Sequence, residues 1–418
     1  MLLASILFLA ATCNGQPLAQ TGLDVVVADA FKDFQGKRIG LVTNHTARDR
    51  HGRHIADLFH QAQGVELKAL FGPEHGIRGL AEGGENIAAQ SDSATGVPIY
   101  SLYGKTYKPT KEMLAGLDAL VFDIQDVGAR FYTYISTMAL AVQAAAENDL
   151  AFYVLDRPNP IGNRVEGPVL DAAHRSFVGI HPIALRHGMT SGELAQMFLG
   201  EGWLWHSSLD TTVAPAPKKA WNKLNVITLK HWRRSQIFYE TQLPWISPSP
   251  NMTSVTTALL YPGMGLLEAT NFSEGRGTMQ PFEVIGAPWL QSERLVALLQ
   301  GKIDGLALTA TTFIPQDLPG KAMNPKFEDE LCRGLKLEIF APQHFESVKF
   351  GVALLWALQQ IHPDQFVIAE ARMARMFGKT WLREMLLLGA GLEPLWQRLE
   401  SEGEAFRQLR KKYLLYEE

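Results

Sequence analysis

Short apolar runs alternate with helical stretches through the first 156 residues, and this alternation constrains the fold most. Buried strands are predicted at residues 38–43, 65–71, 98–102, 119–124 and 151–156. The run 119–124 shows no polar alternation, which is typical of a strand covered on both faces. Helices are predicted at 53–63 and 131–148, with a short one at 110–115. Strands separated by helices build right-handed βαβ units, so the sequence predicts an α/β fold with a mainly parallel sheet.

The length of 418 residues fits two packed domains rather than one. Three prolines within residues 244–250 indicate a connector between them. A glycine-rich loop region is expected at 263–277, and an amphipathic helix at about 393–416 ends the chain. Thr190 and Glu193 form a capping box before an apolar run, which favours a structural role for Glu193.

The N-terminus begins with an apolar stretch, residues 1–13, that is too short to span a bilayer. It resembles a secretory signal or a lipoprotein-type leader, although no Lys or Arg precedes it. We assign residues 1–22 to this leader and expect an exported protein that is periplasmic or lipid-anchored at the cell envelope. A formal net charge of −4 argues against a dedicated nucleic-acid binder.

The predicted strands end in reactive side chains. Loops follow the strands at 65–71, 119–124 and 151–156, and in a doubly wound sheet they converge on one edge. They carry the carboxylates Glu74, Asp123, Asp126, Asp156 and Glu166 and the cations Arg78, Arg130 and Arg157. Crowded carboxylates raise one another's pKa, which can keep one protonated as a general acid. Helix capping and ion pairing explain any single residue equally well, but the group favours a site.

The sequence lacks the motifs that are typical of several other classes of enzyme. The loop at 43–46 has none of the glycines that a dinucleotide needs, and there is no P-loop, G-x-S-x-G, H-E-x-x-H or S-x-x-K. His45, His51, His54 and His60 are spaced as a solvated surface rather than as metal ligands. We therefore expect no metal and no nucleotide cofactor.

The second half adds a Ser-Glu-Gly-Arg-Gly loop at 273–277. Its carboxylate, guanidinium and backbone N–H groups suit a polar or anionic ligand, and an ion-paired structural turn explains them equally well. Four tryptophans in loop-like stretches could stack on sugar rings, although most tryptophans are packing residues: Trp221, Trp232, Trp245 and Trp289.

Several segments together resemble one family. They are residues 41–44, 71–79, 101–104, 121–138, 155–160, 166–171, 186–190, 248–252 and 273–278. From about residue 23 to the C-terminus, the chain resembles the NamZ-type exo-β-N-acetylmuramidases. The resemblance implies a Rossmann-like catalytic domain at 23–247 and a smaller α/β domain at 248–418 that contributes to the cleft. It also implies release of non-reducing-end β-linked N-acetylmuramic acid (MurNAc) from peptidoglycan fragments, without metal or nucleotide.

The resemblance also guides the site residues. Glu74 leads as the catalytic acid because it lies in the most distinctive loop, followed by Glu166 and Asp126. Either Arg130 or Arg276 is expected to bind the lactyl carboxylate of MurNAc. The remaining substrate-binding candidates are His75, Arg78, Asp123, Tyr132, Asn159, His187, Asn251, Ser273 and Glu274. Retaining, inverting and substrate-assisted mechanisms all stay open at this point.

Two other functions compete with this interpretation. One is a different α/β hydrolase acting on cell-wall material, which needs a Ser or Cys nucleophile in the cleft. The other is a non-catalytic muropeptide-binding protein. The sequence leaves the oligomeric state open, and a homodimer is compatible with it.

Overall fold

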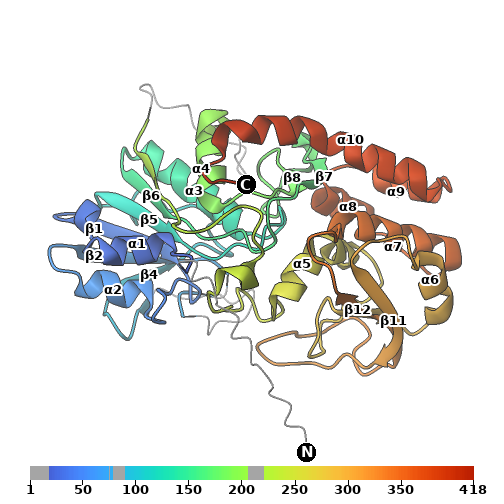
Figure 1. The fold of residues 1–418 in the computed structure, drawn as a ribbon. Coiled ribbons are helices and arrows are strands. Elements are labelled where there is room, and N and C mark those ends of the chain that lie inside the picture. Colours follow the sequence, from blue (N-terminus) through green and yellow to red (C-terminus); the bar gives the residue numbers. More distant parts are fainter. Residues whose placement is uncertain (1–17, 75, 79–89, 206–220) are drawn as a thin grey trace, which may run out of the picture.

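The first domain is built on a seven-stranded sheet. The computed structural model describes residues 18–74, 76–78, 90–205 and 221–418 (Figure 1). The strands lie in the order β3 (Gln90–Ser91), β4 (Pro98–Ser101), β2 (Glu66–Gly72), β1 (Arg38–Thr43), β5 (Ala119–Asp123), β6 (Ala151–Leu155) and β9 (Leu224–Ile227). All neighbours pair in parallel except β3 and β4. The predicted α/β class and parallel sheet are confirmed.

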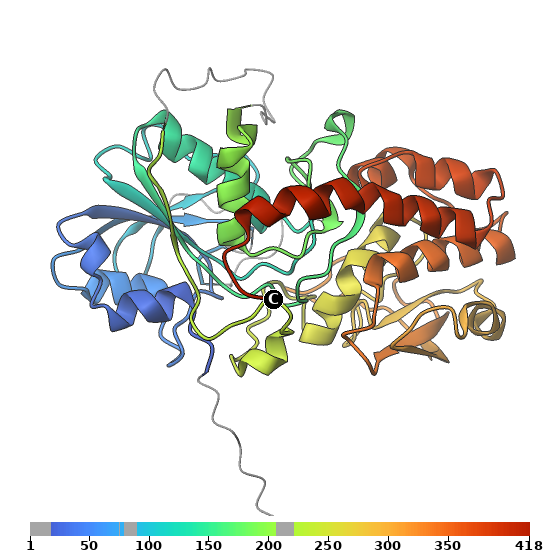
Figure 2. The same ribbon diagram turned by 45° about the horizontal axis from the view of Figure 1, so that its top comes forward.

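Helices cover both faces of this sheet (Figures 1 and 2). On one face, α1 (Gly22–Ala28) and α2 (Ile55–Gln61) bury Leu23, Ile55 and Phe59 against the strands. On the other face lie α3 (Tyr134–Glu147) and α4 (Ser191–Gly200). Every residue of β5 is consequently buried, which explains its uninterrupted apolar sequence.

Two local predictions can be compared with these elements. The capping box that opens α4 is confirmed, and Glu193 is buried and paired with Arg234, as a structural residue would be. The predicted short helix at 110–115 is wrong. A single i→i−4 hydrogen bond, from the amide of Leu114 to the carbonyl of Thr110, is followed by Gly116 at a φ of 78°. The left-handed glycine turns the chain into β5 before a helix can propagate.

The second domain pairs a small antiparallel sheet with helices. The sheet has the order β10 (Val284–Ala287), β12 (Cys332–Ile339), β11 (Leu306–Phe313). The helices are α5 (Val255–Met264), α6 (Ser292–Leu299), α7 (Ser347–Ile361), α8 (Glu370–Phe377), α9 (Trp381–Leu387) and α10 (Leu392–Arg410).

Helices α5 and α7 cross at glycines. A Cβ atom on Gly263 would lie 2.0 Å from the carbonyl oxygen of Ser347, so no larger residue fits at this crossing. The expected loop region at 263–277 is therefore wrong in its first part, because α5 runs through Gly263 and a 3-10 helix (Gly265–Ala269) follows. Along this segment, the first glycines allow close helix packing and the later ones lie in a loop.

The chain crosses between the domains more than once. A two-stranded sheet of β7 (Glu166–Val169) and β8 (Ala184–Arg186) packs against α7 and α10. Helix α10 then extends back over the first domain (Figures 1 and 2). There the amide of Leu415 donates to Glu193 at 2.9 Å and the hydroxyl of Tyr416 donates to Asp156 at 2.5 Å. The C-terminal residues thus pack on the first domain. No helix among the described residues is long and apolar enough to cross a membrane.

Candidate active site

A cavity of about 630 Å³ opens between the loops of the two domains. The first domain contributes Glu74, Tyr103, residues 131–134 and Val178. The second contributes residues 249–252, Tyr261, Glu268, Glu274, Arg276, Phe282, residues 320–326 and Arg372. A monosaccharide-sized ligand fits in this space, since typical small-molecule sites measure about 300–1,000 Å³.

Glu74 is a carboxylic acid that the first domain brings to the cavity. It follows the carboxyl end of β2 and is half-buried. Burial raises the pKa of Glu74, while a hydrogen bond from Tyr103 and the charge of Arg276 act in the opposite direction. Within the part of the chain that the structure describes, no Lys or Arg forms an ion pair with it. Burial, rather than the expected crowding of carboxylates, is therefore the main cause of the shift.

The second domain supplies a cluster of charges. Glu268 lies 3.0 Å from Arg276 and 3.2 Å from Arg372. Glu274 lies 2.9 Å from Lys326 and 3.4 Å from Arg276. Three cations thus share two carboxylates, which leaves an excess positive charge that favours an anionic ligand.

The backbone that carries Glu274 and Arg276 is held in an unusual conformation. Gly275 has a φ of 79°, and a Cβ atom there would lie 2.1 Å from the carbonyl of Val284. Phe282 has a φ of 65°, donates its amide to the carbonyl of Glu274 at 2.7 Å and packs under the guanidinium of Arg276. A left-handed phenylalanine costs about 1–3 kcal/mol, and such strain is common at functional sites.

A wall of aromatic rings completes the cavity. Tyr132 stacks edge-on against Tyr134 at 4.9 Å and against Tyr261 at 5.9 Å between ring centroids. Tyr261 makes the same kind of contact with Phe282 at 5.0 Å. The four tryptophans considered from the sequence do not line the cavity and instead pack elsewhere.

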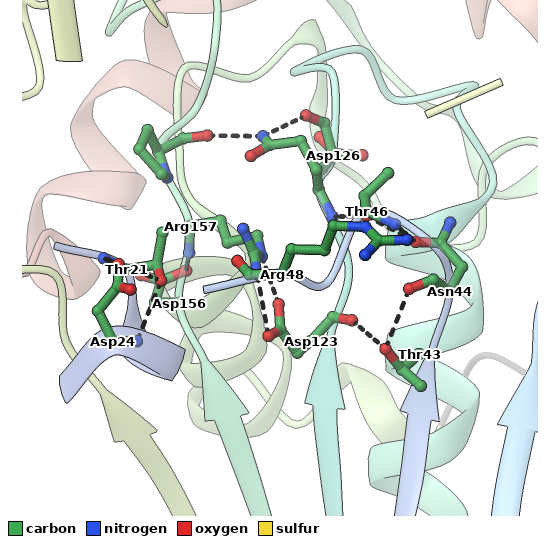
Figure 3. Close-up of polar contacts among 12 residues, drawn as sticks. Thr21, Asp24, Thr43, Asn44, Thr46, Arg48, Asp123, Asp126, Asp156 and Arg157 are labelled. Atoms are coloured by element: carbon green, nitrogen blue, oxygen red, sulfur yellow. Dashed lines mark hydrogen bonds and ion pairs between the residues drawn. The ribbon is translucent and has the colours of Figure 1, made fainter. Parts of the chain in front are cut away.

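Three of the eight predicted strand-end residues meet in a different place: Asp123, Asp156 and Arg157 (Figure 3). Thr46 and Gln125 lie beside them, and we call these five residues the sheet-edge network. Asp123 forms a buried ion pair with Arg157, whose Nη2 lies 3.1 Å from Oδ2. Asp156 accepts hydrogen bonds from the hydroxyl of Thr190 at 2.6 Å and the amide of Gly192 at 2.9 Å. The space beside this network measures only about 30 Å³.

The other two predicted catalytic residues are also engaged in internal contacts. Glu166 pairs with buried Arg186 and accepts the amide of Val348 at 2.8 Å, so it fastens the two-stranded sheet to α7. Asp126 accepts the amide of Gly128 at 2.7 Å and lies 3.5 Å from Nε2 of His187. Neither residue lines the cavity of Glu74.

Arg130 lies away from the cavity, in the protein interior. Its guanidinium donates to the carbonyls of Pro168, Ile183 and Met376 at 2.7, 2.9 and 3.0 Å, and burial lowers its pKa to about 9. Backbone carbonyls thus occupy the donors that a lactyl carboxylate would need. Of the two arginines expected to bind that group, only Arg276 lines the cavity.

The remaining predicted residues divide between the cavity and the scaffold. Tyr132, Asn251, Glu274 and Arg276 join Glu74 in the cavity. The others make contacts within the scaffold. Arg78 bridges Asp57 and Asp92, and Asn159 hydrogen-bonds to the backbone of Met189 and Ile161. His187 accepts a hydrogen bond from the amide of Met189, and Ser273 accepts one from the amide of Gly275. His75 lies outside the described residues. The expectation that these histidines lie on a solvated surface is wrong for His54, which is buried, whereas His51 and His60 are exposed.

Several cavity residues were missed from the sequence: Tyr103, Glu268, Lys326 and Arg372. Tyr103 lies in the segment 101–104 that carried the family resemblance, and this was a usable signal. Lys326 lies on the long connection between β11 and β12, where nothing in the local sequence marks it. Its ammonium reaches the carbonyls of Leu267 and Phe272 and the carboxylate of Glu274 only through the tertiary fold.

The fold and the site together define a two-domain α/β protein with an acid-bearing, cation-rich cavity between its domains. Family models described as exo-beta-N-acetylmuramidase NamZ match both parts, the N-terminal one over residues 39–256 and the C-terminal one over 259–416. The chain belongs to the NamZ exo-β-N-acetylmuramidase family.

Individual relatives cover nearly the whole chain. The peptidoglycan beta-N-acetylmuramidase NamZ of Bacillus subtilis is 42% identical over 404 residues, which are 96% of this chain and 92% of the relative. Crystal structures of two DUF1343 family proteins from Bacteroides fragilis are 34% and 33% identical. They superimpose with TM-scores of 0.85 and 0.76, each over 96% of this chain and 99% of the other.

Proposed function

We propose that this protein is a glycosidase that releases MurNAc from the non-reducing ends of peptidoglycan fragments. Family membership and the named activity of the Bacillus subtilis relative support the reaction. The observation that carries the proposal is Glu74, a cavity carboxylic acid with a pKa raised by burial and no ion-pair partner among the described residues. A raised pKa keeps a proton available at a pH where an ordinary glutamate has lost it.

Glu74 acts as the general acid. As the bond between C1 of MurNAc and the glycosidic oxygen breaks, its proton passes to that oxygen and the leaving sugar departs as an alcohol. A water molecule supplies the hydroxyl that ends on C1 and the proton that returns to Glu74. The hydrogen bond with Tyr103 stabilises the carboxylate in the interval between these steps.

The charge cluster of the second domain selects MurNAc. The lactyl group distinguishes MurNAc from N-acetylglucosamine (GlcNAc) by one carboxylate, and a guanidinium can bind a carboxylate through two parallel hydrogen bonds. Arg276 lines the cavity and interacts electrostatically with Glu74, so we assign it to this group. Lys326 and Arg372 neutralise the carboxylates that share Arg276 and leave its charge available.

Incubation with two disaccharides tests the function. The protein is expected to release free MurNAc from MurNAc-β-1,4-GlcNAc and to leave GlcNAc-β-1,4-GlcNAc intact, as followed by chromatography and mass spectrometry. Binding of the MurNAc disaccharide without cleavage would instead support a muropeptide-binding protein. Cleavage confined to the peptide of a muropeptide would support a different hydrolase.

We further propose that the protein is exported. The apolar stretch at residues 1–13 supports this, and it lies outside the described residues. Ala19 is buried, Gln20 pairs with Lys230 and Thr21 caps α1, which supports a leader shorter than the residues 1–22 assigned from the sequence. Cell fractionation with mass spectrometry of the mature N-terminus tests this. An intact Met1 in the cytoplasmic fraction would contradict it.

A further inference from the structure

Three half-buried aromatic side chains, Tyr103, Tyr107 and Phe177, form a cluster at the cavity that we call the aromatic platform. Tyr107 and Phe177 lie 4.2 Å apart between ring centroids, with an interplanar angle of 36°. Tyr103 contacts Tyr107 at 6.0 Å and Phe177 at 6.1 Å. The mechanism proposed above uses only the hydroxyl of Tyr103 and leaves these ring faces without a role.

The platform begins at the catalytic acid. Tyr103 lines the cavity and shares a hydrogen bond with Glu74. Tyr107 and Phe177 are not part of the cavity lining, so the platform continues from Tyr103 away from the cavity. All three rings belong to the first domain, whereas the cations Arg276, Lys326 and Arg372 belong to the second.

A tight turn holds Phe177 in place. Ser176 and Gly179 pair with each other through two backbone hydrogen bonds of 3.0 and 2.9 Å, and Phe177 and Val178 are the two residues between them. Val178 lines the cavity, and its neighbour Phe177 contacts the platform. One short turn therefore joins the cavity wall to the aromatic surface, and its Phe is kept partly exposed to solvent although Phe is usually buried.

The position of the general acid determines where the cleaved sugar and the leaving sugar bind. A general acid must lie at the glycosidic oxygen, which joins the cleaved sugar to the leaving sugar. The cleaved sugar carries the lactyl carboxylate, and the cations of the second domain attract it. We place the leaving sugar at Tyr103, which contacts Glu74 and begins the platform. Aromatic faces pack against the apolar C–H faces of a pyranose ring.

We propose that Tyr103, Tyr107 and Phe177 form the binding subsite for the leaving sugar, a β-linked N-acetylhexosamine. This assignment rests on the proposed glycosidase function. In this subsite, binding energy from the aglycone holds the glycosidic oxygen at Glu74, so a sugar aglycone is expected to be a better substrate than a small leaving group.

Two substrates that differ only in the leaving group test the subsite. MurNAc-β-1,4-GlcNAc offers a sugar to the platform, whereas β-MurNAc fluoride offers a single atom. For Phe177→Ala and for Tyr107→Ala, the ratio of kcat/KM between disaccharide and fluoride is expected to fall roughly 2- to 12-fold. Phe177→Tyr keeps an aromatic face and is expected to restore the ratio. Phe340→Ala, at a phenylalanine that is 72% exposed and outside the cavity, is the matched control.

The outcomes separate the subsite from the function. An unchanged ratio, or an equal loss on both substrates, would overturn the subsite while leaving the glycosidase function intact. Release of MurNAc from neither substrate by the unaltered protein would overturn the function, and the subsite with it. Phe177→Leu fills similar volume without an aromatic face, so it gives the same test if Phe177→Ala fails to fold.

Discussion

The acidic side chains near the carboxyl ends of the parallel strands lie in two regions, the sheet edge and the cavity, and they differ in which partners they have. At the sheet edge, Asp123 is paired with Arg157 and Asp156 accepts several hydrogen bonds from the protein itself. In the cavity, Glu74 shares one hydrogen bond with Tyr103 and has no ion-pair partner among the residues described. The first group lies beside almost no free space, whereas the second lies beside about 630 Å³.

This difference indicates which carboxylates are available for chemistry. A buried carboxylate whose acceptor sites are filled by the protein holds the fold together, and removing its partner destabilises the protein. A partly buried carboxylate with few protein partners and an open cavity keeps its proton and can pass it to a ligand.

Glu74→Gln should have the largest effect. Loss of the general acid is expected to lower kcat on MurNAc-β-1,4-GlcNAc by about 10²- to 10⁴-fold, while the thermal midpoint stays unchanged. Glu166→Gln is the matched control, because its ion pair with Arg186 predicts a loss of stability instead. Near-normal turnover by Glu74→Gln would remove Glu74 from the catalytic role.

Asp123→Asn should act on stability. Leaving Arg157 buried without its anion is expected to lower the free energy of unfolding by about 3–5 kcal/mol, measured by denaturant titration. The control is Asp118→Asn at the other end of β5, where the pair with Arg38 is exposed and the expected loss is much smaller. A stable Asp123→Asn protein with abolished kcat would reverse the roles assigned to the two regions.

Arg276→Gln should change selectivity. Losing the charged hydrogen bonds to the lactyl carboxylate is expected to reduce the preference for MurNAc over GlcNAc glycosides roughly 10- to 100-fold, mainly through KM. Arg383→Gln, at an arginine outside the cavity that pairs with Glu370, serves as the control. An unchanged preference would show that another group recognises the lactyl carboxylate.

Tyr103→Phe should have the smallest effect, a shift of the pH profile of activity in one predicted direction. The hydrogen bond from Tyr103 lowers the pKa of Glu74, so its removal raises that pKa further. Activity needs protonated Glu74 and is lost as the pH rises through this pKa. The alkaline limb of the kcat/KM profile should therefore move up by about one pH unit. A limb that stays in place or moves down would exclude this coupling.

Much of the fold could be predicted from the sequence. The strands β1, β2, β4, β5 and β6 were predicted, and β1 and β5 were the easiest to recognise because residues on both faces of a buried strand must be apolar. The second domain was predicted less well, since Gly263 signals a loop in sequence terms but permits a helix crossing in the structure. A glycine pattern does not distinguish these two uses without knowledge of the packing partner.

The site was predictable only in part. The loop of Glu74 was recognised, but convergence of strand ends predicted that it would lie with Asp123 and Asp156. Strands β5 and β6 are neighbours, so their terminal carboxylates do meet, whereas β2 is separated from β5 by β1. The partners of Glu74 come instead from the loop after β4 and from the second domain, and such tertiary convergence has no local sequence signal.

The proposed proton transfer from Glu74 to the leaving sugar can be tested with two substrates that differ in their need for an acid. Fluoride leaves with little help from an acid, so Glu74→Gln is expected to retain hydrolysis of β-MurNAc fluoride while losing hydrolysis of MurNAc-β-1,4-GlcNAc. Measuring kcat for both substrates on the same preparation gives the answer. An equal loss on both substrates, or no loss on either, would contradict the account.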